Sequence, residues 1–259
     1  MMIKAPARKQ RNAILNALSA ADLRCSNPTC SRWRYRFGIG LQAAHSRIPT
    51  IAFIESGLGS VVAIGGKRRQ AEVGVIGREG MTGLPIVLGA ECSPCEIFMQ
   101  VGGSGQSIDA DHLSDAMDRS LTMARCFQRF AHVFAVQASC TALANAQGRV
   151  EERLARWLLM AHDRIGSDML KLTHEFLALM LGVRRAGVTT ALRHLEQNAI
   201  IDMARGVVTI VDRGRLEECA DGLYGQPEAE FERLFPASQF TAAISPEPTS
   251  CRADGAETG

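Results

Sequence analysis

The sequence is poor in aromatic residues and contains no long hydrophobic run. Phe, Trp and Tyr together make up 5% of the 259 residues, so we expect a core built mainly from aliphatic side chains. No apolar stretch approaches the roughly 20 residues that a membrane-spanning helix needs. The basic N-terminus also lacks the apolar segment and cleavage site of a secretory signal. These absences predict a cytoplasmic protein without a membrane contact.

The sequence lacks acidic residues in a local stretch near the N-terminus. The net charge is +2, so a surface that binds nucleic acid would have to be a local one. Acidic residues are absent from Leu23 to Ile54, a stretch that contains five arginines. Within it, residues 25–50 show no clear periodicity. Eight cysteines are scattered along the chain, and we interpret most of them as reduced thiols that fill the core.

Residues 1–109 are predicted to form a β domain that begins with a short amphipathic helix at 11–24. Ile14, Leu15 and Leu18 lie on the apolar side of this helix. Short β-rich runs separated by turn residues indicate an antiparallel roll or barrel. The runs are IAFI, SVVAI, AEVGVIG, PIVLG and EIFMQV. Glycines recur at every third position, which suits tight turns as well as ligand contact: Gly74, Gly77, Gly80 and Gly83.

A long helix is predicted over residues 110–146, because the chain contains no proline or glycine there for more than thirty residues. Apolar residues fall at helical spacing on it, namely Phe127, Phe130, Phe134 and Ala138. We interpret these four as a dimerisation stripe, with one face of the helix on the β domain and another on a partner chain. Burial of the helix wholly within its own chain is the alternative. In the favoured interpretation, residues 110–147 hold the dimerisation helix and a hinge near Asn145–Gly148.

The segment LTHEFLALMLGVRRAGVTTALRHLEQ, residues 172–197, predicts two short helices joined by a tight turn. Thr173 is a good N-cap for the first helix. Gly182 can take a positive φ, which ends that helix and turns the chain. Arg184 and Arg185 then stand at the start of the second helix. Two helices joined in this way form a helix-turn-helix, whose second helix enters the major groove of DNA.

Local charge and side-chain chemistry support DNA as the partner. Residues 171–215 carry seven Lys or Arg against four Asp or Glu. Arg185 is predicted to donate two hydrogen bonds to the O6 and N7 atoms of guanine. Thr189 and Thr190 are placed to meet a thymine methyl group or a phosphate, and His174 to touch a phosphate. The strand GVVTIVD after Arg205 is similar to the wing of a winged helix-turn-helix; a helical hairpin in an ordinary core is the structural alternative.

Residues 236–259 are rich in Pro, Ser, Thr, Ala and Gly, so we expect residues 226–259 to form a mostly disordered tail. No enzyme is predicted. The glycine-containing segment GVIGREG is not the GxGxxG of a dinucleotide site, and no lysine follows it as in a phosphate-binding loop. No Ser/His/Asp set or carboxylate pair stands out.

The order of these elements, with RVEERLARWLLMAHDRIG before the two short helices, resembles the Crp/Fnr family of bacterial transcription regulators. AEVGVIGREGMTGLP resembles the sensor roll of one subgroup. The resemblance extends from about Ile51 to Tyr224. It implies an α+β fold with an N-terminal antiparallel, jelly-roll-like β-roll, a dimerisation helix, and a C-terminal winged helix-turn-helix over residues 148–225. It also implies a homodimer that reads a pseudo-palindromic site on double-stranded DNA and controls RNA polymerase.

The resemblance assigns roles within the second helix. Arg185 falls at the family's guanine-reading arginine. Ala186 replaces an acidic base-reading residue, and Thr190 replaces a basic one. The target sequence should therefore differ from that of the cyclic-AMP receptor. Thr173 belongs to the same DNA-binding set, and Arg184 and Arg193 are candidate phosphate contacts.

The sensor departs from the family pattern for cyclic nucleotides. Family members hold the ribose with a Gly-Glu pair and the phosphate with an arginine. Gly83 matches the glycine, but Leu84 or Pro85 replaces the acid and Cys95 falls near the arginine position. Because no Lys or Arg lies between Arg78 and Arg119, a bound phosphate would lack a charge-assisted bond. We place the candidate effector pocket at four residues and expect no cyclic nucleotide in it: Gly80, Gly83, Leu84 and Cys95.

Two further departures leave alternatives open. Residues 25–50 stand where the family begins its roll, so either the first strands are altered or the local sequence arose by a reading-frame slip. Cys25-x4-Cys30 and Cys92-x2-Cys95 fit the spacing of an iron–sulfur or zinc site poorly. We therefore predict no metal or other cofactor. A regulator that senses redox state or metal through its cysteines, and a dimeric adaptor that has lost DNA binding, are the competing functions.

Overall fold

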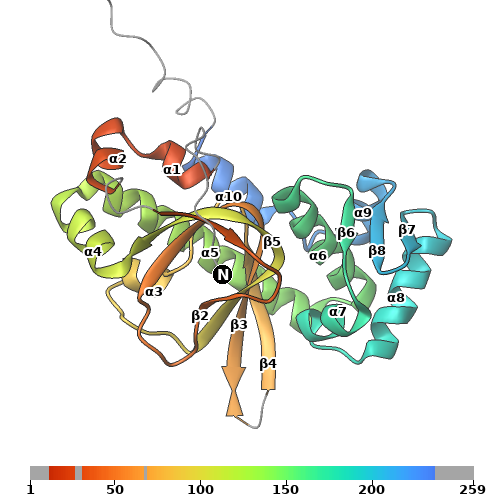
Figure 1. The fold of residues 1–259 in the computed structure, drawn as a ribbon. Coiled ribbons are helices and arrows are strands. Elements are labelled where there is room, and N and C mark those ends of the chain that lie inside the picture. The colour runs from red at the N-terminus through yellow and green to blue at the C-terminus, as the bar shows by residue number, and fades with distance from the viewer. Residues whose placement is uncertain (1–11, 27–30, 67–68, 237–259) are drawn as a thin grey trace, which may run out of the picture.

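An antiparallel sheet forms most of the N-terminal domain (Figure 1). The computed structural model describes residues 12–26, 31–66 and 69–236. The strands of this domain are β1 (Ser31–Tyr35), β2 (Gly40–Gln42), β3 (Thr50–Gly65), β4 (Arg69–Ile76) and β5 (Cys95–Asp109). Their order is β1-β5-β3-β4, with β2 also paired to β5. Register shifts between β3 and β5 around Ser56 mark bulges, which bend long strands. The predicted antiparallel β-roll is confirmed.

Two of the predicted strand assignments were wrong in detail. IAFI and SVVAI belong to one strand, β3, because the residues between them also pair with β5. PIVLG is not a strand: Leu84–Val87 forms the short helix α3. Pro85 explains the difference, because proline has no N–H for a sheet and is favoured in the first turn of a helix.

The basic stretch at residues 25–50 contains the first strands of the roll, β1 and β2. Trp33 of β1 pairs with Gly105 of β5, and Gly40 of β2 pairs with Phe98. Arg32 makes an ion pair with Glu55 at 3.0 Å. The unusual sequence therefore still forms strands here. In β1, arginines alternate with Trp33 and Tyr35, a pattern that an edge strand can accommodate. Residues 27–30, including Cys30, lie outside the described residues.

Two short helices precede the roll instead of the one predicted over 11–24. They are α1 (Ala13–Ala17) and α2 (Ala20–Ser26). Leu18 between them is extended, with φ −75° and ψ 145°. The Ser19 hydroxyl accepts a hydrogen bond from the Asp22 N–H at 3.1 Å and so caps the second helix. Ile14, Leu15 and Leu18 are buried as predicted.

The predicted helix over 110–146 is divided in two. The helices are α4 (Ala110–Arg119) and α5 (Leu121–Gln147). Ser120 separates them, with φ −133° and ψ 100°. Its hydroxyl accepts from the Met123 N–H at 3.2 Å and donates to Asp22 at 2.5 Å. A serine that caps a new helix and bonds a distant carboxylate outweighs the helical pattern of its neighbours.

Helix α5 lies unusually close to β4 and the turn after it. A Cβ atom at Gly80 would lie 2.3 Å from Cζ of Phe130, and one at Gly74 would lie 2.8 Å from Oε1 of Gln137. Gln137 fastens the helix to the strand, because its side chain accepts from the Val75 N–H at 2.6 Å and donates to the Val75 carbonyl at 3.1 Å. These two glycines therefore serve close helix–sheet packing.

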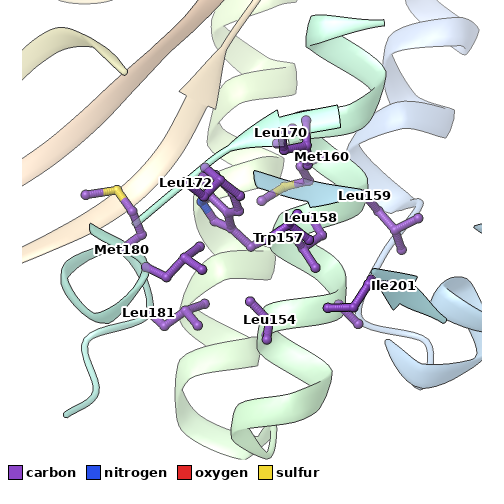
Figure 2. Packing of buried hydrophobic residues seen from close by; sticks show 14 of the residues in the cluster. Leu154, Trp157, Leu158, Leu159, Met160, Leu170, Leu172, Met180, Leu181 and Ile201 are labelled. Carbon is purple, nitrogen blue, oxygen red and sulfur yellow. The ribbon is translucent and has the colours of Figure 1, made fainter. Parts of the chain in front are cut away.

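The C-terminal domain packs around one buried helix. Its elements are α6 (Val150–Ile165), β6 (Met169–Lys171), α7 (His174–Leu181), α8 (Arg185–Gln197), β7 (Ile201–Ala204), β8 (Val207–Ile210) and α9 (Arg213–Cys219). The strands form a sheet in the order β6-β8-β7. Side chains from α6, α7 and the sheet meet in one apolar cluster (Figure 2), with Trp157 and Leu158 of α6 3% and 0% exposed.

The prediction of a mostly disordered tail from residue 226 was wrong for residues 226–236. Gln226–Leu234 form helix α10, which packs against α5 and lies beside α1 (Figure 1). Phe231 and Phe235 stack with their ring centroids 4.8 Å apart, and Phe235 is buried. The tail from residue 237 lies outside the described residues. None of the helices in the described ranges is long and apolar enough to cross a membrane.

Buried polar contacts join the two domains. Glu72 of β4 accepts a hydrogen bond from the Trp157 indole N–H at 2.6 Å, and the Ser60 hydroxyl donates to it at 2.6 Å. Arg164 of α6 donates to Glu79 at 2.7 Å. Burial raises the pKa of Glu72 to about 7, although the hydrogen bonds from Ser60 and Trp157 oppose the shift.

Candidate nucleic-acid interface

The turn between α7 and α8 has the geometry that the sequence predicted. Thr173 caps α7, because its hydroxyl accepts from the Phe176 N–H at 3.2 Å. Gly182 ends α7 with φ 61°, in the left-handed region. The Val183 N–H then bonds the Ala178 carbonyl at 3.0 Å. This arrangement closes the helix with a glycine C-cap and fixes the direction in which α8 leaves the turn.

One face of α8 is apolar and buried, and the opposite face is exposed to solvent. Val188, Leu192 and Leu195 are fully buried against the domain core. The other face is exposed, and it begins with cations: Arg184, Arg185, Ala186, Thr190 and Arg193. All five of these residues were predicted for DNA contact. The first turn of α8 therefore presents cationic and small side chains to solvent.

Arg185 points outward, with its side chain 66% exposed. Its guanidinium group forms an ion pair with Glu175 of α7 at 2.9 Å. Glu175 was not among the predicted site residues, because this pair depends on the angle between the two helices. An exposed ion pair is worth at most about 1 kcal/mol. The arginine can therefore exchange Glu175 for another acceptor at little cost.

Two predicted contact residues are partly buried and hydrogen bond to each other within the motif. His174 Nδ1 and Thr189 Oγ1 are 3.0 Å apart and hydrogen bonded. The Thr189 hydroxyl also donates to the Arg185 carbonyl at 3.1 Å. Both side chains are part-buried, so they connect α7 to α8. The prediction that they reach DNA missed this role because it used the helical position alone.

The wing also forms as predicted. Strands β7 and β8 are antiparallel and are joined by Arg205 and Gly206, which have φ 46° and φ 80°. Positive φ at both positions is typical of a tight hairpin turn. Arg205 is exposed at the tip. It was not among the predicted contact residues, although its place before the turn glycine marked it in the sequence.

Known proteins contain a domain similar to this one. The family profile of the Crp-like helix-turn-helix domain matches residues 152–219. A protein assigned to the Crp/Fnr family from Eubacterium rectale has a TM-score of 0.66 at 18% identity, covering 83% of this chain and 100% of its own. The chain thus carries a Crp-like helix-turn-helix domain on the Crp/Fnr fold. Over most of its length the chain has the same fold as that protein.

Two other solved structures are similar over a smaller part of this chain. FixK2 from Bradyrhizobium japonicum has a TM-score of 0.63 at 15% identity, covering 73% of this chain and 96% of its own. The c-di-GMP-responsive regulator CLP from Xanthomonas campestris has a TM-score of 0.61 at 15% identity, with coverages of 74% and 99%. No curated protein matches the chain.

The predicted dimerisation stripe is mostly internal. Phe127 and Phe130 are 0% and 2% exposed and belong to the core of the β-roll. Phe134 and Ala138 are half-buried. The assignment of Phe127 and Phe130 to a partner chain is therefore corrected. The exposed face of α5 instead carries residues at alternating spacings of four and three: Leu121, Arg125, Gln128, His132, Ala135, Ser139, Ala142 and Ala146.

The predicted effector residues are divided between two environments. Leu84 and Cys95 line a cavity of about 380 Å³ between the roll, α3 and α5. Gly80 and Gly83 do not line it, because Gly80 faces Phe130 and a Cβ at Gly83 would lie 2.4 Å from Ile51. No group of three or more His, Cys, Asp or Glu placed to hold a metal ion occurs within the described ranges.

Proposed function

We propose that the chain is a bacterial, cytoplasmic, homodimeric regulator that binds specific double-stranded DNA and acts on RNA polymerase. The observation that carries this proposal is the exposed, cation-bearing start of α8 on a glycine-closed turn. In a helix-turn-helix, this part of the second helix meets the base edges of the major groove. The Crp-like domain match supports the same geometry.

Each exposed cation has a distinct proposed role. Arg185 reads guanine through two parallel hydrogen bonds, after releasing Glu175. Arg184 and Arg193 contact phosphates, and Arg205 extends the phosphate contacts from the wing. Thr190 and Ala186 contribute small surfaces next to the bases. His174 and Thr189 hold α8 in place, so they affect DNA binding through orientation.

A second copy of the chain completes the DNA-binding unit. One stripe of exposed residues on α5, from Leu121 to Ala146, alternates at spacings of four and three, which is the 3.5-residue period of a two-stranded coiled coil. Small residues dominate the C-terminal half of this face, namely Ala135, Ser139, Ala142 and Ala146. Two α5 helices can therefore approach closely and set two α8 helices on two half-sites.

The signal reaches DNA through the contacts that join α5 to the Crp-like domain. The Arg156 guanidinium lies 3.4 Å from the Gln137 carbonyl on α5. Arg153 donates to Asn145 at 2.8 Å and also to the Leu181 carbonyl, next to the turn glycine. A shift of α5 would therefore redirect α7 and α8, and a signal that favours one arrangement shifts the population toward it.

Selection of bound fragments from random duplex DNA tests the proposal. Wild-type protein should enrich a pseudo-palindromic sequence with a preferred guanine in each half-site. Arg185→Ala should lose that preference at a cost of about 1–3 kcal/mol. The matched control, Arg193→Ala, should weaken binding to all sequences and reduce the salt slope by about 1. Unchanged base preference in Arg185→Ala would contradict the assignment of the α8 arginine.

A further inference from the structure

The cavity beside α3 is built almost entirely from apolar side chains. Its volume is about 380 Å³, within the range of small-molecule sites. Val61, Val73 and Ile76 contribute from strands β3 and β4, Leu84 from α3 and Phe134 from α5. Residues of three different parts of the fold therefore surround one space.

The lining excludes a charged ligand. Among the described residues that line the cavity, none is Lys, Arg, His, Asp or Glu. A phosphate or carboxylate placed there would lose its water without gaining a cation or a hydrogen-bonded partner of opposite charge. An uncharged apolar molecule is stabilised by the same surroundings, because binding removes apolar surface of both the ligand and the cavity lining from water.

One buried polar atom gives the cavity a specific requirement. Gln42 of β2 is 6% exposed and lines the cavity. Its amide Nε2 donates to the Cys95 carbonyl at 3.1 Å, which fixes the side chain. Its Oε1 is buried and has no hydrogen-bond partner among the described residues. A buried acceptor without a donor is unfavourable, so a ligand that brings one donor would be selected.

We propose that this cavity binds an uncharged, mainly apolar small molecule that carries one hydroxyl or N–H group and donates it to Gln42 Oε1. The proposal deepens the function proposed above and rests on it, because it names the chemical class of the signal that the β-roll senses.

The position of the cavity explains how such a ligand would act on the dimer. Phe134 lines the cavity and also packs on Gly74, whose added Cβ would lie 2.9 Å from the ring. One turn along α5, Gln137 fastens the helix to β4. Ala135 lines the cavity and lies on the exposed face of α5. A molecule in the cavity therefore contacts Phe134, beside the point where α5 is attached to β4, and Ala135, on the face of α5 that we propose meets a second copy.

The test uses N-phenyl-1-naphthylamine, a neutral apolar fluorophore with one N–H group, titrated into the full chain without DNA. We expect saturable binding, about tenfold or more weakened in Val73→Phe, which fills the cavity. The matched control is Val211→Phe, at a 60% exposed site in the C-terminal domain. It should bind as wild type does. Millimolar cyclic AMP should not displace the probe.

Gln42→Leu tests the hydrogen bond separately from the shape of the cavity. This variant should bind N-phenyl-1-naphthylamine roughly threefold to tenfold more weakly, the worth of one hydrogen bond. The N-methylated analogue, which has no donor, should bind the variant at least as well as wild type. The proposal is overturned by absent binding, by full binding in Val73→Phe, by equal losses for both probes in Gln42→Leu, or by displacement with cyclic AMP. Failure of DNA selection alongside intact probe binding would overturn the regulatory function alone.

Discussion

Glu72 is a carboxyl group buried between the two domains, and its replacement tests how they are joined. It is 3% exposed and receives hydrogen bonds from Ser60 and Trp157. Arg156 and Arg164 attract its charged form, but burial outweighs these effects and raises its pKa from 4.5 to about 7. A raised pKa means that the folded protein prefers the protonated acid. Glu72→Gln keeps a neutral group of the same shape at every pH.

The sign and size of the effect follow from proton linkage. Between pH 4.5 and 7 the folded state binds this proton and the unfolded state does not, so the free energy of unfolding falls as pH rises. The stabilisation is fully present below the unfolded pKa of 4.5 and is lost once pH passes the folded value of about 7. One pKa unit corresponds to about 1.4 kcal/mol, so the full loss is about 3 kcal/mol.

Urea unfolding at several pH values between 4.5 and 8 measures this loss. The stability of Glu72→Gln relative to wild type should rise by about 3 kcal/mol across the range. The indole N–H resonance of Trp157 should titrate near pH 7 in wild type and stay fixed in the variant. Glu218→Gln, at an exposed site on α9, is the matched control and should follow wild type. A pH dependence of stability that is the same in wild type and Glu72→Gln would refute the reasoning.

Three other substitutions test packing and charge. Gly80→Ala places a methyl group 2.3 Å from Phe130 and should lower the free energy of unfolding by about 1–3 kcal/mol, whereas Gly40→Ala, with open space around it, should leave it nearly unchanged. Glu175→Gln should tighten binding to the selected DNA up to about fivefold, since it frees the α8 arginine from an exposed ion pair; weaker binding would contradict this. Phe235→Ala should cost about 3 kcal/mol in thermal unfolding and expose α10 to protease, and an unchanged digestion pattern would count against the packing of that helix.

The helix-turn-helix could be predicted because its signals are local. Thr173 caps a helix through its own neighbours, and Gly182 takes a positive φ that other residues avoid. The apolar positions Val188, Leu192 and Leu195 repeat at helical spacing and are buried as expected. None of these features depends on residues far away in the chain. Glu175 shows the limit, since its pairing with Arg185 depends on the angle between two helices.

The role of the α5 face could not be predicted in the same way. Helical spacing shows that Phe127, Phe130 and Phe134 share a side of the helix, but it cannot show whether the roll or a partner covers that side. The glycines at 74 and 80 contained the missing information, since they permit the close approach of α5 to β4. Their spacing was interpreted as turn or ligand chemistry because a sequence does not show which atoms lie opposite a glycine.

Helix α10 escaped prediction because residues 226–235 were grouped with the disordered tail, although the composition that predicts disorder begins at residue 236. Pro227, Phe231 and Phe235 are too few to raise the apolar content of residues 226–259, yet Pro227 and Phe235 are buried and Phe231 stacks on Phe235. A proline near the start of a nine-residue helix is a recognised signal. The periodic pair that follows it would have indicated a short amphipathic helix.

Burial of the phenylalanine stripe also changes the expected strength of the dimer. The exposed surface of α5 carries mainly small and polar residues, and only Leu121 and Leu143 are large and apolar there. Most of these residues bury less apolar area than phenylalanine would, so we expect the helix contact alone to stabilise the proposed dimer modestly. A pseudo-palindromic DNA site would bind both copies together, and its binding energy would add to the dimer contact by linkage. If the chain acts as proposed, we therefore expect assembly of the dimer and recognition of DNA to be coupled steps.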